Sequence, residues 1–135
     1  MKYYLAKTDP DSYSISDLER EKSTEWSGVR NPQAVQFLKA MQPQDRVFIY
    51  HSQGEGSLRG LAEVQGAGHA DPANPKSWLV TLRLLHVYEE PFVTIKDIRA
   101  TDLFPDFLLL RQSRLSVLPV PKEVVQFLKK KKVQV

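Results

Sequence analysis

The clearest helical signal lies in the second quarter of the chain. Asn31 followed by Pro32 has the form of a helix start, with asparagine as the cap and proline at the first helical position. The apolar residues that follow are three or four positions apart, as on one buried face of a helix. They are Ala34, Phe37, Leu38 and Met41. We expect this helix to end before Pro43.

Three further helices are predicted, two from capping residues at their starts and one from the spacing of its apolar residues. Ser16–Glu19 resembles a capping box, in which the first side chain bonds a backbone N–H three residues on, and predicts a helix over residues 17–21. Thr94 and Asp97 have the same spacing and predict a second. Residues 122–130 predict a third, whose inward positions are Val124, Phe127 and Leu128.

The other apolar stretches are short, rich in β-branched and aromatic residues, and separated by turn-forming residues. They predict strands at Tyr3–Ala6, Arg46–His51, Gly60–Val64, Trp78–Tyr88 and Leu115–Leu118. A turn at residues 53–56 and a proline-fixed loop at 71–75 separate the middle strands. Five or six short strands interrupted by short helices predict an α+β fold, built on a small closed β-barrel of mixed or antiparallel strands.

Length and composition agree with a globular protein. At 135 residues, with 41% hydrophobic and 26% charged positions, the chain is expected to form one domain over residues 1–135. The N-terminal segment meets a charge at Lys2 and again at Lys7, too early for a signal-peptide core. Without cysteine, disulfides and thiolate metal sites are excluded. We therefore expect that the protein is not secreted. We expect it to be cytoplasmic or, in a eukaryote, nuclear.

The positive charge is concentrated at one end of the chain. The net charge is +3, and removing the four lysines of residues 129–132 leaves −1 for the rest. The basic tail, about residues 129–135, has two interpretations. A lysine run is most often a solvated helix end, where it faces the negative pole of the helix dipole. The alternative is a phosphate-binding tail.

The sequence carries no catalytic, metal or cofactor motif. His51, His69 and His86 lie far apart, without the spacing of metal ligands. The Gly54–Gly56 turn lacks the lysine and the helix that follow a phosphate-binding loop. Ser52 beside His51 is no dyad, because neighbouring strand residues point to opposite faces. These observations favour a binding protein without a cofactor over an enzyme.

Three segments combine aromatic, arginine and small polar residues at the ends of predicted elements. Trp26–Asn31 leads into the predicted helix that starts at Pro32, where free N–H groups favour an anionic or acceptor-rich partner. Tyr50–Ser52 ends a strand with a ring and two hydrogen-bonding side chains, as recognition of a planar heterocycle requires. Leu109–Ser116 places Arg111 and Arg114 at the entry to the last strand.

Each segment also has a purely structural interpretation. Trp26 and Tyr50 would be core residues, and Asn31 only a cap. Arg30 and the 109–116 segment would be solvated, and His51 would be a buried histidine with its hydrogen bond satisfied. Taken one at a time, the segments favour these structural interpretations.

Taken together and in order, five segments resemble the motifs of the EVE domain family, which belongs to the PUA-like superfamily. The segments are Lys7–Pro10, Glu25–Asn31, Ile49–Ser52, Gly60–Val64 and Leu109–Val117. They span nearly the whole chain, and the one around Trp26 is the most specific. The sequence departs from the family at Asp9, where a glutamate is usual.

The resemblance implies a PUA-like fold with a pocket, between barrel strands and adjoining helices, that takes in one base. The positions that match the family's pocket motifs are Trp26, Arg30, Asn31, Tyr50, His51, Ser52, Arg114 and Ser116. Lys7 and Arg111 are candidate phosphate contacts. The resemblance thus implies nucleic-acid binding, with a modified base in DNA or RNA as ligand. The alternative is a small-ligand or nucleotide binder, or an RNA-acting enzyme of the wider superfamily, with His51 or Lys7 as acid or base.

Overall fold

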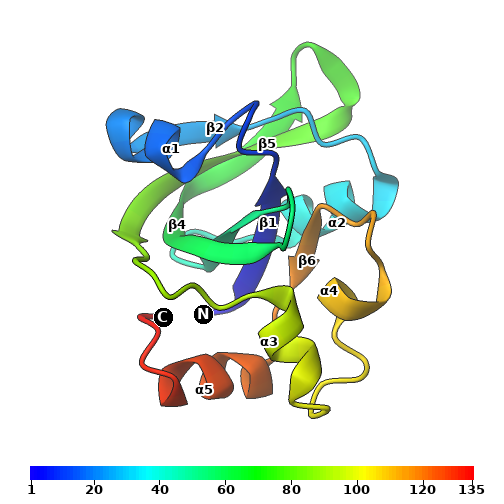
Figure 1. The fold of residues 1–135 in the computed structure, drawn as a ribbon. Helices are drawn as coiled ribbons and strands as arrows, with labels where there is room; N and C mark the ends of the chain where they lie inside the picture. Colours follow the sequence, from blue (N-terminus) through cyan, green and yellow to red (C-terminus); the bar gives the residue numbers. More distant parts are fainter.

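The computed structural model describes residues 1–135 and consists of a mixed sheet flanked by short helices (Figure 1). The strands are β1 (Tyr3–Thr8), β2 (Ser23–Trp26), β3 (Arg46–His51), β4 (Ser57–Asp71), β5 (Asn74–Val87) and β6 (Val117–Pro119). The helices are α1 (Ile15–Glu21), α2 (Pro32–Ala40), α3 (Ile95–Ala100), α4 (Leu108–Arg111) and α5 (Lys122–Lys130). None of the helices has the length and apolar character needed to cross a membrane.

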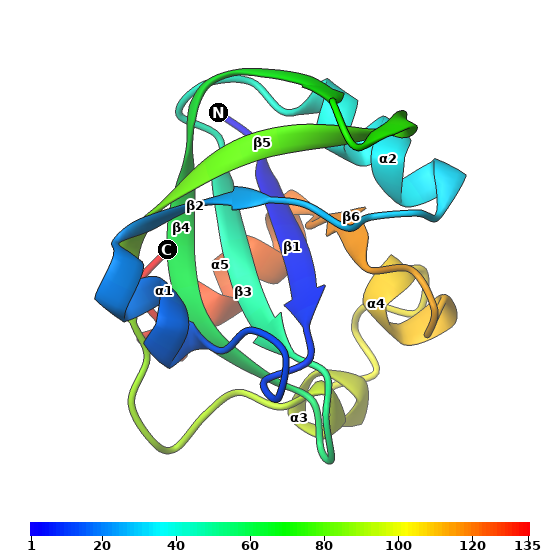
Figure 2. The same cartoon turned by 90° about the horizontal axis from the view of Figure 1, so that it is seen from above.

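The six strands form one sheet in the order β2-β5-β4-β3-β1-β6. β1 lies parallel to β3, with Leu5 opposite Phe48, and antiparallel to β6, with Leu5 also opposite Leu118. The other neighbouring pairs are antiparallel. Figure 2 shows the sheet strongly curled, with β5 crossing over β1 and β3. The α+β fold is confirmed, but hydrogen-bonded closure of the barrel is not found, because β2 and β6 are the ends of the strand order.

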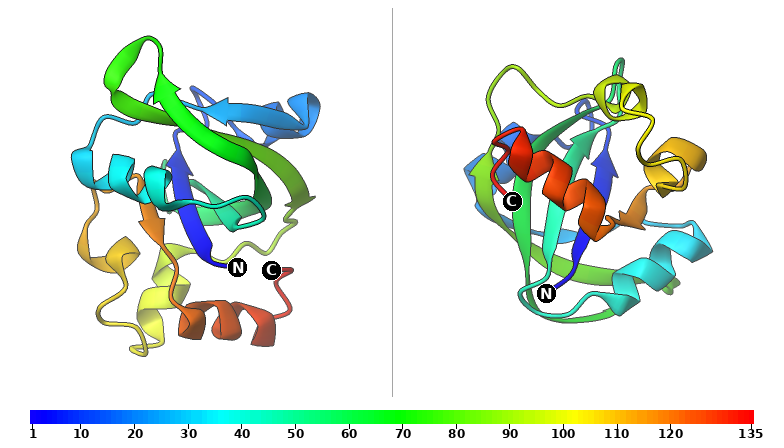
Figure 3. Two further views of the ribbon diagram at one scale, coloured as in Figure 1. Left: turned by 180° about the vertical axis from the view of Figure 1, so that it is seen from behind. Right: turned by 90° about the horizontal axis from the view of Figure 1, so that it is seen from below.

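Both faces of the curled sheet contribute to the core, since consecutive residues of β1 and β3 are buried. Leu5, Phe48, Leu61, Leu82 and Leu118 are all fully buried there. Two helices cover the sheet in line with the sequence prediction. Asn31 caps α2, whose Ala34, Val35 and Leu38 are buried. α5 lies below the sheet (Figure 3) and buries Val124, Val125 and Leu128, while Phe127 is only partly buried.

The first helix starts earlier than the sequence suggested. Ser14, not Ser16, is the cap of α1, and its side chain accepts the backbone N–H of Asp17 at 3.2 Å. The carboxylate of Asp17 accepts the Ser14 backbone N–H at 2.8 Å, which completes the capping box. The prediction of a box from Ser16 to Glu19 was therefore wrong by two residues. Ser14 is the cap rather than Ser16, and in the helix that starts after it Ile15 and Leu18 face the core. The box at Thr94 and Asp97 is confirmed at the start of α3.

The predicted loop around residues 71–75 is instead the tip of a long hairpin. β4 and β5 pair up to Asp71 opposite Asn74, with irregular register near the tip. Pro75 is tolerated in β5 because it lies beyond the part of that strand, Val80 to Arg83, that pairs with β2. The predicted strand Trp78–Tyr88 is therefore shorter than β5.

Two elements were missed, and one was misplaced. β2 is a four-residue edge strand with one buried residue, too short to show alternation. α4 is a single turn without a side-chain cap. β6 starts at Val117 rather than Leu115, so Leu115 and Ser116 belong to the segment that leads into it.

Candidate functional site

A cavity of about 340 Å³ opens where β1 ends. Its walls come from the end of β1, the segment before α1, the end of β2 with the turn after it, and the residue before β6. The lining residues are Lys7, Thr8, Asp9, Tyr13, Thr24, Glu25, Trp26, Ser27, Gly28, Val29 and Ser116. The volume lies in the range of small-ligand sites. Three segments far apart in the sequence therefore meet at one cavity.

Three of the predicted site residues, Lys7, Trp26 and Ser116, line this cavity. Pairing of β1 with the segment before β6 brings two of them together, because the Lys7 backbone N–H donates to the Ser116 carbonyl at 2.8 Å. The Lys7 ammonium donates to the Ser113 carbonyl at 3.0 Å. Burial lowers the pKa of Lys7 below its ordinary value. Lys7 is thus a fixed donor in the cavity wall rather than a free surface lysine.

Two aromatic rings form the apolar side of the cavity. Trp26 retains 7% of its accessible surface, and the ring of Tyr13 meets it edge to face, with the centroids 6.1 Å apart. The Tyr13 hydroxyl donates to the Glu21 carboxylate. Burial and this hydrogen bond raise the pKa of Tyr13 to about 12, so the hydroxyl stays neutral at physiological pH. The two rings hold each other in place, and most of the Trp26 indole belongs to the core.

The polar side of the cavity carries two carboxylates. Asp9 uses one oxygen to accept the Asp11 backbone N–H at 2.9 Å. Glu25 lies 3.5 Å from His69 Nε2, and both side chains are more than half exposed. The charged lining residues are thus two carboxylates, which only accept, and one ammonium, which only donates. This balance suits a neutral ligand that presents N–H groups better than a phosphate.

The turn at the cavity mouth depends on one glycine. Gly28 has φ +77°, in the left-handed region where other residues are strained. This conformation turns the chain from β2 towards α2, and Ser27, Gly28 and Val29 line the cavity in sequence. The Val29 carbonyl accepts the Ser77 hydroxyl at 2.6 Å, which fixes the turn against β5.

Arg30 and Asn31 do not line the cavity, although they directly follow this turn. Both are exposed. The Asn31 side-chain oxygen accepts the backbone N–H groups of Gln33 at 2.8 Å and Ala34 at 3.1 Å. The oxygen of Asn31 is thus used in capping α2, which leaves its amide N–H groups as the only part free for a ligand.

Tyr50 and His51 are buried and lie outside the cavity lining. The Tyr50 ring lies 6.0 Å from the Lys7 ammonium, so it supports the residue that reaches the cavity. His51 Nε2 accepts the Ile15 backbone N–H at 3.0 Å. Burial, together with the nearby Arg59, lowers the pKa of His51. The neutral imidazole is therefore committed to holding α1.

The remaining predicted residues, Ser52, Arg111 and Arg114, are not among the lining residues. Ser52 is exposed, and its backbone N–H donates to the carbonyl of the cavity residue Thr8 at 3.0 Å. Arg111 lies 3.6 Å from the exposed Asp106. Arg114 is exposed two residues before Ser116. These three residues are outside the lining but on segments that reach it.

The sequence interpretation missed several lining residues. Asp9, Glu25 and Ser27 stand inside motif segments that had been singled out, so their position was a usable signal. Tyr13 and Thr24 gave none, because the approach of β2 to the segment before α1 is a consequence of the tertiary fold.

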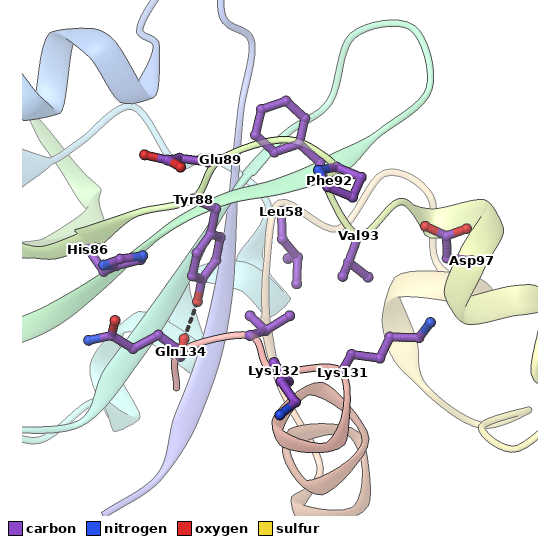
Figure 4. A pocket seen from close by; sticks show the side chains of 12 residues that line it. Leu58, His86, Tyr88, Glu89, Phe92, Val93, Asp97, Lys131, Lys132 and Gln134 are labelled. Atoms are coloured by element: carbon purple, nitrogen blue, oxygen red, sulfur yellow. Dashed lines mark hydrogen bonds between the residues drawn. The ribbon is translucent and has the colours of Figure 1, made fainter.

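A second cavity, of about 620 Å³, lies between the end of β5, residues 89–93 and residues 131–134 (Figure 4). The Tyr88 hydroxyl donates to the Gln134 carbonyl at 2.6 Å across it. Lys131 and Lys132 line this cavity together with Glu89 and Asp97, so its charges are mixed. None of the predicted site residues lines it. Two lysines of the basic tail are thus placed at a different cavity from Trp26.

Comparison with known proteins gives one consistent family. Residues 2–131 match the family model described as the EVE domain. Thymocyte nuclear protein 1 from Homo sapiens is 26% identical over 93% of this chain and 71% of its own length. Rpa0253 from Rhodopseudomonas palustris has a solved structure with a TM-score of 0.87 and 30% identity, covering 96% of this chain and 92% of that one.

A structure of the human THYN1 protein in complex with 5-methylcytosine-containing DNA has the same fold. Its TM-score is 0.87 at 23% identity, with 100% of this chain and 99% of that one covered.

Proposed function

Since the chain belongs to the EVE domain family, we propose that it binds DNA through a modified base, with the base held in the cavity lined by Lys7, Trp26 and Ser116. The observation that carries the proposal is the meeting of three family motif segments at one cavity with an aromatic wall and an acceptor-rich side. The human relative solved with 5-methylcytosine DNA makes that base the first candidate.

The chemistry of the cavity supports cytosine over thymine. The exocyclic amino group of cytosine is a donor, which a carboxylate such as that of Asp9 can accept, whereas thymine presents a carbonyl at the same position. The Lys7 ammonium is a donor for the O2 or N3 acceptor of cytosine. A 5-methyl group would lie against apolar surface from Trp26, Tyr13 or Val29. The cavity thus offers a partner for each edge of the base.

Phosphate contacts are assigned to residues outside the cavity. Carboxylates within it oppose an anion, while Arg30, Arg111 and Arg114 are exposed on the segments that surround it. A base can reach the cavity only when it leaves the stack, at a cost of a few kcal/mol in a duplex, so single strands and mismatched sites bind best. Affinity falls as salt rises, because each phosphate contact releases counterions.

The test is a titration of single-stranded DNA oligonucleotides that differ in one base: 5-methylcytosine, cytosine or thymine. We expect the methylated strand to bind most tightly and thymine least. Lys7→Met should weaken binding of the methylated strand, because it removes the donor for the O2 or N3 acceptor of cytosine and roughly keeps the side-chain volume. Lys96→Met, on the exposed surface of α3, is the matched control and should bind like the parent chain.

Equal affinity for the three strands would reject a base-reading cavity. Loss of binding to the same extent in Lys7→Met and Lys96→Met would indicate only a general effect of positive charge. Arg114→Ala should weaken binding to all three strands alike and reduce the salt slope by about one unit, as expected for a phosphate contact. The alternative of an acid–base enzyme at His51 gains no support, since its Nε2 is engaged by Ile15.

A further inference from the structure

A groove of about 730 Å³ lies between α2, α5 and the first residues of β1. The left view of Figure 3 shows the start of the chain between α2 and α5, and both helices contribute residues to the groove. Seven of its twelve lining residues are hydrophobic. Val120 and Val125 are buried and Tyr3 and Phe37 partly buried, so they form an apolar floor.

The charged residues that line this groove are all lysines. Lys2, Lys122 and Lys129 are exposed along it, and no aspartate or glutamate is among the lining residues. α2 has no acidic residue at any position. Asp45, close to Lys2, is buried and accepts the backbone N–H groups of Lys2 and Gln42, both at 2.9 Å. Its charge is therefore directed inward and does not offset the lysines.

We propose that this groove docks an acidic amphipathic helix of a partner protein. The apolar face of such a helix would cover Phe37 and Val125, and its carboxylates would meet Lys122 and Lys129. A nucleic acid matches the groove less well. Its phosphates satisfy the lysines but leave the apolar floor in contact with water.

Occupation of the groove leaves the base cavity free. The groove includes Tyr3 and Tyr4 at the start of β1, and the cavity includes Lys7 and Thr8 at its end. The six residues of β1 separate these ends by about 17 Å at the usual rise of a strand. One protein could therefore hold a DNA base at one end of β1 and a protein partner at the other.

The test uses a displayed library of helical peptides of about 15 residues, with Asp or Glu on one face and Leu, Ile or Phe on the other. The matched library has Lys or Arg in place of the acidic residues. We expect enrichment from the acidic library alone. Enriched peptides should bind the Lys122→Glu/Lys129→Glu variant about tenfold more weakly, since two attractive pairs become repulsive. Lys76→Glu/Lys96→Glu is the charge-matched control.

The outcomes separate protein docking from nucleic-acid binding. Absence of enrichment from the acidic library, or equal binding by the two double variants, overturns the proposal. Binding of methylated DNA that is weakened by Lys122→Glu/Lys129→Glu and not by Lys76→Glu/Lys96→Glu also overturns it, since that result assigns the groove to nucleic acid. Amide chemical shifts of the parent chain give an independent readout: enriched peptides should perturb α2 and the start of β1, and shifts confined to the base cavity contradict the proposal. The replaced lysines are exposed, so both variants should keep the fold.

Discussion

The Nε2 atom of His51 accepts the backbone N–H of Ile15 at 3.0 Å, which links the end of β3 to the first residue of α1. The bond requires a neutral imidazole, because a protonated ring has no acceptor. α1 in turn carries Glu21, which accepts the Tyr13 hydroxyl beside Trp26. A buried histidine outside the cavity therefore helps to position its aromatic wall.

Folding stability should fall on mild acidification. The pKa of His51 is lowered in the folded protein, so the unfolded chain binds the proton more tightly. The stabilisation is complete above the unfolded value of about 6.5 and is lost as pH falls towards the lower folded pKa. Denaturant unfolding at a series of pH values should show this slope. His51→Gln should remove part of this slope.

His51→Ala at neutral pH should cost about 1–3 kcal/mol of unfolding free energy, because the buried Ile15 N–H loses its partner. A pH slope that is identical in the parent chain and in His51→Gln would contradict the assignment.

Trp26→Ala should destabilise the protein before it tests binding. The indole is 7% exposed and belongs to the main core cluster, so truncation should cost about 3–5 kcal/mol. Tyr13→Phe keeps the ring against Trp26 and removes only the hydroxyl bond to Glu21, so we expect a loss of about 1 kcal/mol. Denaturant midpoints of the two variants give the comparison. An unchanged denaturant midpoint in Trp26→Ala would contradict the core role of the indole.

Asn31→Ala should lower stability by about 1 kcal/mol, because two backbone N–H groups of α2 lose their acceptor. Asn31→Asp retains the acceptor and should keep the stability of the parent chain. Asn31→Asp removes the amide N–H groups but also adds a negative charge, so Gln33→Glu, at an exposed position of α2, is the charge-matched control for binding of methylated DNA. Unchanged affinity of Asn31→Asp would limit Asn31 to capping, and a complex weaker than that of Gln33→Glu would return it to the binding site.

Asp9→Asn should reduce the preference for cytosine over thymine by about tenfold, since the amide oxygen stays with the Asp11 N–H and the NH₂ group that faces the base cannot accept from the cytosine amino group. The variant keeps the oxygen that accepts the Asp11 N–H, so the turn should be preserved. Asp11→Asn is the control, because its carboxylate bonds Gln53 and does not line the cavity. Competition binding with paired cytosine and thymine strands measures the effect. Equal changes in both variants would point to net charge instead of base recognition.

The sequence predicted the elements whose signals are local. α5 and β3 have the predicted bounds, and α2 starts at the predicted cap, because caps and apolar spacing depend on a few neighbouring residues. The bounds of β2 and of the β4–β5 hairpin depend on pairing between distant strands, which local patterns do not contain.

The same distinction between local signals and tertiary contacts applies to the candidate site. Lys7, Trp26 and Ser116 come together because β1 lies beside the segment before β6 and β2 lies over the same end of the sheet. Three of the motif segments meet at the cavity, but a motif does not tell which side chain faces it. Tyr50 and His51 share one motif segment and are buried residues that support the cavity from outside. Asp9 and Glu25, in two other motif segments, lie in the lining.

The pairing of β1 with β3 and β6 has a consequence for synthesis of the protein. β1 is translated before the other five strands, but one of its edges has no partner until Val117–Pro119 has been made. Until then the nascent chain carries an apolar strand with an open edge, a state that is prone to association with other chains. Completion of the sheet, and with it the wall formed by Lys7 and Ser116, is a late event that follows translation of almost the entire domain.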